Sequence, residues 1–309
     1  MSKRLVGKIN QNTKALLVGD NPFHNISHLS QERTRFRDKT VTVPELAADL
    51  ILTAVDNGAN GFMFSVSETT LAILRVLREK GRIDQLGLYA IVPYAYEYVR
   101  MSTQVGGISG LTKKVVGRIV ATGNLKALAT GFLGFLMTDP ERLLKTYLIY
   151  EINRIRAAAG KRIDLESVML HEVITDLALA LNLDSIFKAH IDYMSELGIT
   201  PGFNTCNFVY LVDKFREWNI DLGQVVVASP FNKVGFQMTT SQENNEAALR
   251  RLPKPIVIAI SVLAAGYLKP LEALEYISTL PNLRGLAIGV SNKSHAIETF
   301  NLVEQKLVN

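Results

Sequence analysis

The sequence predicts an α/β protein built as a single (β/α)8 barrel, the TIM-barrel architecture. Eight short apolar runs recur along the chain, and stretches with helical spacing separate them. The runs have strand length, and the connections are long enough for a crossover helix, so neighbouring strands are expected to be parallel. With 309 residues, 48% of them hydrophobic, the chain can bury the core of one barrel domain spanning residues 1–309.

The apolar runs are the predicted strands. They cover residues 15–18, 61–66, 86–92, 167–173, 200–205, 224–231, 254–263 and 284–291. The predicted helices cover residues 43–57, 69–80, 184–197, 208–218, 244–251, 271–280 and 293–307. Glycine follows several of these helices, as at Asn57-Gly58 and Leu197-Gly198, where a left-handed residue commonly ends a helix.

One connection is far longer than a barrel requires. Residues 100–162, between the third and fourth predicted strands, contain eleven Lys and Arg and three acids, so their net charge is +8. The net charge of the whole chain is +5, which leaves −3 for the rest. The stretch Thr138-Asp139-Pro140 predicts the start of a further helix, with proline at its first position. We expect a basic helical insertion that is a lid, an oligomer contact or an added helical layer with a solvated face.

Composition restricts the compartment and the partners. The single cysteine, Cys206, excludes an internal disulfide and a multi-thiolate metal centre, and a buried filler is the commoner use of one thiol. We find neither a signal peptide nor an apolar run long enough to span a membrane. The expectation is a cytoplasmic protein with no spanning helix and no nucleic-acid partner, which forms a homo-oligomer through the insertion if that segment is an interface.

Polar side chains lie at the carboxyl ends of the predicted strands, which meet at one mouth of a parallel barrel. In chain order these residues are Asp20, Asn21, His24, His28, Ser65, Ser67, Glu68, His171, Glu172, Asn204, Cys206, Asn207, Ser229, Asn232, Lys233, Ser261, Ser291, Asn292 and Lys293. Such groups cost stability unless a ligand or a polar network satisfies them. An active site at this mouth is therefore predicted.

His171 and Glu172 are the clearest catalytic candidates. Neighbouring strand residues point to opposite faces, so only one of the two can face the barrel interior. A histidine there would act as a general acid or base, with Glu172, Glu68 and Asp20 as partners. The alternative is a core histidine satisfied by hydrogen bonds.

His24 and His28 are candidate ligands of a divalent metal. Their spacing places both imidazoles on one face if the loop is helical, and Asp20, Glu68 or Glu172 could add oxygen ligands. The alternative is that both histidines cap a helix. Lys233 could form an imine only in a desolvated position, and its polar neighbourhood predicts exposure.

The last strand-to-helix junction is a candidate anion site. Gly289, Ser291, Asn292 and Lys293 place backbone amides, a hydroxyl and an ammonium group at the start of a helix. Barrels often bind phosphate at this position. The alternative is an ordinary helix cap with a solvated lysine.

Several of these segments resemble the aldo-keto reductase barrels. PIVIAISVLAAGYL and LRGLAIGVSNKSHAIETF resemble the last two strands of that family, which hold the phosphates of NADP. SETTLAILRVLREKGRIDQLGLYAIV resembles its second helix and third strand, and VMLHEV its fourth. FNTCNF and SPFN resemble the fifth and sixth strands. The similarity extends over about half of the chain.

The resemblance implies an NAD(P)-binding barrel in which His171 is catalytic and Asn207 and Asn232 lie on the cofactor side. The family also uses an aspartate, a tyrosine and a lysine beside the histidine. Here the second strand reads GFMFSVSE, with neither aspartate nor a following tyrosine, and the third reads YAIV where the lysine would lie. Of the four catalytic residues, only His171 is retained.

Three functions remain open at this point. The first is a barrel enzyme of the lyase, isomerase or hydrolase type that acts on a small anionic metabolite, phosphorylated or carboxylated, by acid/base chemistry, with or without a divalent metal. The second is an NAD(P)H-dependent oxidoreductase with altered catalytic residues. The third is a non-catalytic protein that binds acidic surfaces through its basic insertion.

Overall fold

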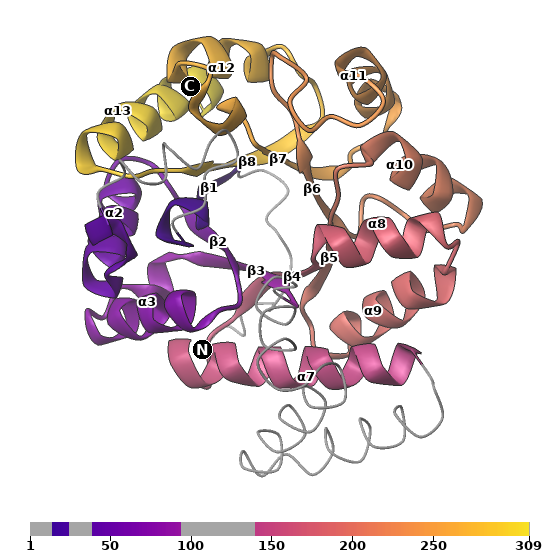
Figure 1. Cartoon of the computed structure of the whole chain (residues 1–309), viewed down its shortest axis with the longest axis horizontal. Coiled ribbons are helices and arrows are strands. Elements are labelled where there is room, and N and C mark those ends of the chain that lie inside the picture. The colour runs from indigo at the N-terminus through magenta and orange to yellow at the C-terminus, as the bar shows by residue number, and fades with distance from the viewer. Residues whose placement is uncertain (1–13, 25–38, 94–139, 309) are drawn as a thin grey trace, which may run out of the picture.

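The computed structural model describes residues 14–24, 39–93 and 140–308, and within them eight parallel strands close into a barrel in chain order (Figure 1). The strands are β1 (Ala15–Gly19), β2 (Gly61–Ser65), β3 (Gly87–Val92), β4 (Leu165–Leu170), β5 (Thr200–Asn204), β6 (Val226–Pro230), β7 (Ile256–Ile260) and β8 (Leu283–Gly289). β8 pairs with β1 over five residue pairs, which closes the sheet. The predicted fold class is confirmed.

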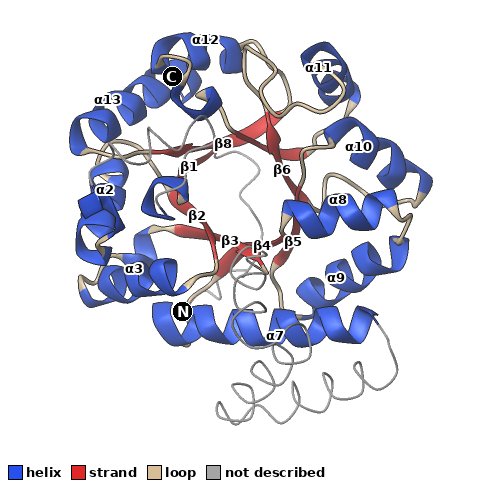
Figure 2. Ribbon diagram, in the orientation of Figure 1, coloured by secondary structure: helices blue, strands red, loops and turns tan. Residues whose placement is uncertain are grey.

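Helices surround the strands as an outer ring (Figure 2). They are α2 (Pro44–Val55), α3 (Glu68–Glu79), α7 (Pro140–Ala159), α8 (Glu172–Ala180), α9 (Asp184–Glu196), α10 (Phe208–Glu217), α11 (Gln242–Arg251), α12 (Pro270–Ser278) and α13 (Lys293–Val303). Short 3-10 turns are η1 (Asn21–His24), η2 (Lys39–Thr42), η3 (Ile83–Gln85) and η4 (Ala264–Gly266), and a π-helical turn, η5 (Glu304–Val308), follows α13. Among the described residues, no helix combines the length and the apolar character that crossing a bilayer requires.

The fourth strand is shorter than its apolar run predicts. β4 ends at Leu170, His171 is the cap residue of α8, and Glu172 is the first residue of that helix. The prediction of a strand over residues 167–173 is therefore wrong at its end. The reason is local: the imidazole of His171 accepts a hydrogen bond from the backbone N–H of Val173, as a helix cap does.

α7 is the described part of the predicted insertion. It begins at Pro140, as the proline signal predicts, and it packs between two helices of the outer ring. Arg78 of α3 donates to the carbonyl oxygen of Ala157, and Lys145 pairs with Glu196 of α9. The rest of the insertion, residues 100–139, lies outside the described residues, so the lid and the oligomer contact stay predictions.

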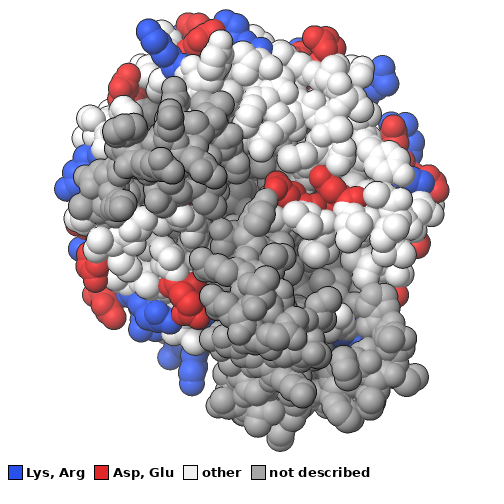
Figure 3. Space-filling model, in the orientation of Figure 1, with Lys and Arg blue, Asp and Glu red and all other residues white. Residues whose placement is uncertain are grey.

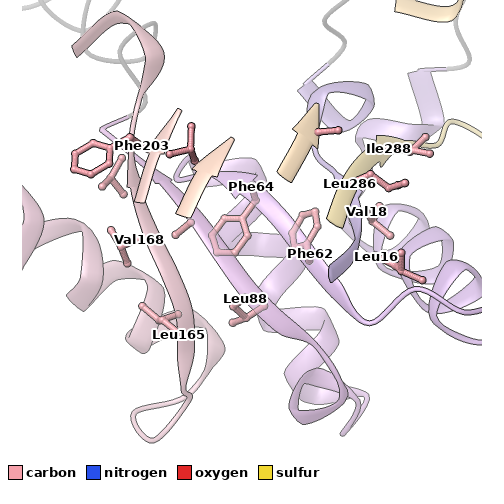
Figure 4. Packing of buried hydrophobic residues seen from close by; sticks show 14 of the residues in the cluster. Leu16, Val18, Phe62, Phe64, Leu88, Leu165, Val168, Phe203, Leu286 and Ile288 are labelled. Atoms are coloured by element: carbon pink, nitrogen blue, oxygen red, sulfur yellow. The ribbon is translucent and has the colours of Figure 1, made fainter. Parts of the chain in front are cut away.

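Side chains of most strands alternate between two hydrophobic clusters. Leu17, Met63 and Met169 belong to a smaller cluster that fills the barrel interior. Their neighbours point outward and pack under the helices, as Figure 4 shows for the labelled residues Leu16, Val18, Phe62, Phe64, Leu88, Leu165, Val168, Phe203, Leu286 and Ile288. This alternation fixes which side chains at the strand ends face the mouth.

Closure of the barrel depends on glycine at one position of β8. A Cβ atom on Gly285 would lie 2.1 Å from the carbonyl oxygen of Ala15 on the paired strand β1. The carbonyl oxygen belongs to the backbone and the backbone fixes the position of a Cβ atom, so neither can move aside without opening the β1–β8 pairing.

We predict that Gly285→Ala lowers the free energy of unfolding by about 2–3 kcal/mol, because the added methyl group overpacks the strand pair. Gly19→Ala is the matched control, since a Cβ there would meet its nearest atom at 3.5 Å. Urea denaturation of both variants measures the effect. Equal losses of unfolding free energy in the two variants would contradict the explanation that the barrel closes because Gly285 has no Cβ atom.

Candidate active site

His171 lies at the mouth of the barrel, on its inner face. Met169 points into the interior and Leu170 points outward, so the alternation directs His171 inward. Its backbone N–H still donates to the carbonyl oxygen of Val92, at 2.9 Å, which holds the residue beside the end of β3. The residue is 5% exposed.

The hydrogen bonding of His171 determines where its proton lies. Nδ1 accepts from the backbone N–H of Val173, with 3.2 Å between the nitrogens. Burial lowers the pKa of the ring to about 4, and the nearby negative charge of Asp20 opposes this only in part. The ring is therefore neutral at physiological pH, and its single proton is on Nε2, because Nδ1 needs its lone pair to accept.

Asp20 joins three elements at the same mouth. Its Oδ2 atom accepts from the backbone N–H of Ser65 at 2.6 Å and lies 3.0 Å from Nε2 of His24. The side chains of Asp20 and His24 are 7% and 8% exposed. Asp20 also lies close enough to His171 for its charge to raise the pKa of that ring. The structure thus brings together Asp20, His24 and His171, as the sequence predicted for the mouth; His28 lies outside the described residues.

Two carboxyl groups of α8 lie next to the end of β5. Asp176 accepts a short hydrogen bond from the hydroxyl of Thr205 and a second from the backbone N–H of Cys206. Burial raises the pKa of Glu172, and neighbouring Asp176 raises it further. Burial also raises the pKa of Asp176, although hydrogen bonds from Thr205, Cys206 and Asn207 act against it.

Cys206 is a packing residue in this arrangement. Its Sγ atom lies 3.8 Å from Oε2 of Glu172, and burial together with the two carboxylates raises the pKa of the thiol to about 12. A thiol with so high a pKa is not a nucleophile at neutral pH. Asp176 was not among the residues that the sequence predicted for the site, although its spacing of four residues from Glu172 on a helix was the available signal.

Glu68 takes part in the outer helical layer. It is the first residue of α3, and its carboxylate lies 3.1 Å from a guanidinium nitrogen of Arg154 in α7. Arg154 also binds Glu151, whose carboxylate is fully buried. Within the described part of the chain, no three His, Cys, Asp or Glu side chains are grouped so that they could hold a metal ion. The metal site that includes His28 stays a prediction.

The predicted anion site lies at the start of α13. Asn292 caps this helix by accepting from the backbone N–H of His295 at 2.8 Å, and Lys293 is exposed at its first position. Gly289 is packed tightly, since a Cβ there would lie 2.8 Å from the ring of Pro22. The first turn of a helix leaves backbone N–H groups without partners inside the helix, and the binding of an anion beside Ser291 and Lys293 stays a prediction.

Two predicted cofactor residues are engaged in local structure. Asn232 is fully buried, and its amide bonds both backbone groups of Phe236 at 2.8 Å. The side chain of Asn207 bonds Asp176. Lys233 is exposed and pairs with Glu272 at 2.7 Å, so the desolvation that imine chemistry needs is not met.

The loop after β7 contains backbone strain that the sequence did not reveal. Ser261, Ala264 and Ala265 have φ values of 52°, 45° and 58°, in the left-handed region. Side chains with a Cβ atom rarely adopt this conformation, and such strain is concentrated at functional sites. The loop follows β7, beside β8, at the same end of the barrel as Ser291.

The fold has solved counterparts, although no protein-family model matches the sequence and no curated protein matches it. A protein from Pseudomonas aeruginosa, provisionally assigned as an aldo-keto reductase, matches with a TM-score of 0.59 and 14% identity, over 99% of this chain and 95% of that one. The holo form of an aldo-keto reductase from Bacillus halodurans matches with a TM-score of 0.52 and 12% identity, over 98% and 91%. The chain has an aldo-keto reductase-like barrel fold. At such identities the likeness establishes the fold alone.

The aspartate that the resemblance implies is missing from the second strand, and the carboxylate of Asp20 lies at the end of that strand. The resemblance implies an aspartate at the second strand, where this chain has none. In the aldo-keto reductase-like barrel described here, Asp20 extends from the end of β1 and bonds the backbone N–H of Ser65 at the end of β2. A carboxylate is therefore present at this edge, supplied by a different strand.

We predict that stability depends on pH through His171 and His190, a fully buried ring bonded to the carbonyl oxygen of Val168. Burial lowers both pKa values from 6.5 to about 4. The unfolded chain therefore takes up these protons first, so the stabilisation is complete above pH 6.5 and is lost as the pH falls towards 4. Glu172 and Asp176, with raised pKa values, act in the opposite direction.

Comparison of wild type with His171→Asn isolates the contribution of His171. Between about pH 7 and pH 4.5, the wild type should lose on the order of 2 kcal/mol more unfolding free energy than the variant. Urea denaturation at both pH values measures this difference. If wild type and variant lost equal amounts of unfolding free energy, His171 would not be held neutral in the folded chain.

Proposed function

We propose that this chain is an oxidoreductase that reduces the carbonyl group of a small molecule with a nicotinamide nucleotide. The observation that carries the proposal is the neutral His171 at the mouth, with Nδ1 bonded to Val173 and the proton on Nε2. A neutral N–H donor at this place suits the oxygen of a carbonyl group. The shared fold with aldo-keto reductases supports the same function.

His171 would act by stabilising charge on the substrate oxygen. Hydride addition to a carbonyl carbon leaves negative charge on the oxygen, and a fixed donor in a desolvated site stabilises that charge. The ring is fixed by its bond to Val173, so little reorganisation is needed during the reaction. Because the pKa of the ring is about 4, His171 donates a hydrogen bond without supplying a second proton.

His24 is the candidate source of the proton that the oxygen finally receives. Its Nε2 atom lies 3.0 Å from Oδ2 of Asp20, which orients the ring at the mouth. Hydride would reach the carbon and a proton from His24 the oxygen, and solvent would then reprotonate His24. In this mechanism, the Asp20–His24 pair would take the place of the tyrosine and lysine that the resemblance implies.

The residues present fit the phosphate end of a nicotinamide nucleotide. Ser291 and Lys293 would hold a phosphate at the start of α13, beside the strained loop after β7. Asn207 and Asn232 stay predicted cofactor residues, and their amides also bond Asp176 and Phe236. When bound, the nucleotide supplies hydride.

A second candidate is an isomerase or lyase that acts by acid/base chemistry on a small, anionic metabolite. The raised pKa of Glu172 favours it, since a carboxylate of raised pKa is a better general base near neutral pH. His171 would again donate to a carbonyl oxygen, while Glu172 removed a proton from the adjacent carbon. Binding of acidic surfaces by residues 100–162 stays a third prediction.

We predict that His171→Asn keeps the fold and loses the activity. Asparagine is a favourable helix cap, so the variant should retain the start of α8 and unfold within about 1 kcal/mol of wild type. Carbonyl reduction with NADPH or NADH should fall by about 100-fold or more, because the oxygen loses its donor. The measurement pairs a thermal melt with nucleotide oxidation on the same preparation.

His171→Leu serves as the comparison, because it removes both the cap and the donor and should lose stability as well as activity. If His171→Asn turns over normally, His171 is not catalytic. If the wild type binds no nicotinamide nucleotide, the oxidoreductase proposal itself fails and the acid/base candidate takes its place.

A further prediction concerns the site at α13. NADPH should raise the melting temperature of the wild type by mass action on the native state, and Lys293→Ala should reduce that shift. Lys188→Ala is the control, because Lys188 is an exposed lysine that pairs with Asp184 on α9. An equal shift in both variants and in the wild type would remove Lys293 from the nucleotide site.

A further inference from the structure

Asn204, the last residue of β5, has a side-chain oxygen without a hydrogen-bond donor. The side chain is 7% exposed, and within the described residues no donor reaches its Oδ1 atom. An amide oxygen buried without a donor is destabilising, so native structures rarely retain one that nothing satisfies. Neither the fold nor the proposed chemistry of His171 accounts for it.

Asn204 lies beside His171 on the inner face of the barrel. Phe203 belongs to the outer cluster, so the alternation points Asn204 inward, as it does His171. β4 and β5 are paired with Leu170 opposite Phe203, which places His171 and Asn204 at the same level of neighbouring strands. Such neighbours are about 4.8 Å apart, so both can contact one small molecule through adjacent atoms.

We infer that Asn204 determines substrate specificity and selects a hydroxyl group on the carbon next to the carbonyl. His171 donates from Nε2 to the carbonyl oxygen, and the substrate hydroxyl donates to Oδ1 of Asn204. The substrate class is then an α-hydroxy aldehyde or an α-hydroxy ketone. This inference rests on the proposed carbonyl chemistry of the same site and adds to it the group that the substrate must carry.

The charges around the mouth favour a neutral compound within this class. Glu172 and Asp176 lie next to the end of β5, and each raises the free energy of a further negative charge nearby. Figure 3 shows acidic atoms at the surface on the side of the opening where α8 lies. A carboxylate in place of the hydroxyl would face both these acids and the amide oxygen of Asn204.

The test uses two ketones of the same shape, hydroxyacetone and butanone, in which a hydroxyl replaces a methyl group. Wild type, Asn204→Leu and Asn204→Asp are compared by kcat/KM with NADPH or NADH, and thermal melts confirm that each variant folds. Wild type should prefer hydroxyacetone by about tenfold or more, the usual worth of one buried hydrogen bond. Asn204→Leu should abolish the preference, because kcat/KM falls by a larger factor for hydroxyacetone than for butanone, whereas Asn204→Asp, which keeps an acceptor, should retain it.

The outcomes separate this inference from the function on which it rests. Turnover of both ketones with no preference, or an equal loss for both in Asn204→Leu, overturns the role of Asn204 and leaves the oxidoreductase proposal intact. If no turnover occurs with either nucleotide, the oxidoreductase proposal fails, and saturation-transfer NMR of the two ketones with the protein alone then decides the inference. Binding of hydroxyacetone that Asn204→Leu abolishes supports it, and equal or absent binding overturns it.

Pyruvate, which carries a carboxylate in place of the hydroxymethyl group, tests the charge argument in the same assays. Wild type should use it less well than hydroxyacetone. A preference for pyruvate would overturn the assignment of a neutral substrate.

Discussion

The hydrogen bond from the backbone N–H of Val173 to Nδ1 of His171 is the interaction on which the site depends. It ends β4, begins α8 and fixes the ring, all through one acceptor nitrogen. The same bond determines that the neutral ring carries its proton on Nε2. Burial then keeps the ring neutral, with a pKa of about 4. A structural cap and a chemical donor are therefore the same side chain, which couples the local fold to the proposed chemistry.

Other polar groups at the mouth are also held by hydrogen bonds, some to backbone N–H groups and some to side chains. Asp20 accepts from Ser65 and holds His24, so one carboxylate links the end of β1 to the end of β2. Asp176 accepts from Thr205 and Cys206, which links α8 to the end of β5. These bonds offset the cost of burying polar groups at strand ends. Asn204 differs from these residues, because its buried side-chain oxygen has no hydrogen-bond donor in the described part of the chain.

The sequence predicted the barrel because buried parallel strands are continuous apolar runs, and each of the eight strands lies largely within its predicted run. It failed at His171, because an apolar run does not show that a side chain will cap the next helix. Asp20, His24 and His171 were predicted to share the mouth, since the carboxyl ends of parallel strands converge. The bond of Asn207 to Asp176 in α8 and the bond of Asn232 to Phe236 in its own loop could not be predicted, because they depend on loop conformation. Strain at Ala264 and Ala265 was equally hidden, since alanine carries no signal for a left-handed residue.

The tautomer of His171 is the most direct measure of this account. Long-range proton–nitrogen NMR correlations of the histidine rings, recorded on the ¹⁵N-labelled chain and assigned with His171→Asn, report which ring nitrogen carries the proton. We predict a neutral ring with the proton on Nε2 at neutral pH, and protonation only near pH 4. A ring that is charged at neutral pH, or a neutral ring with its proton on Nδ1, would contradict it.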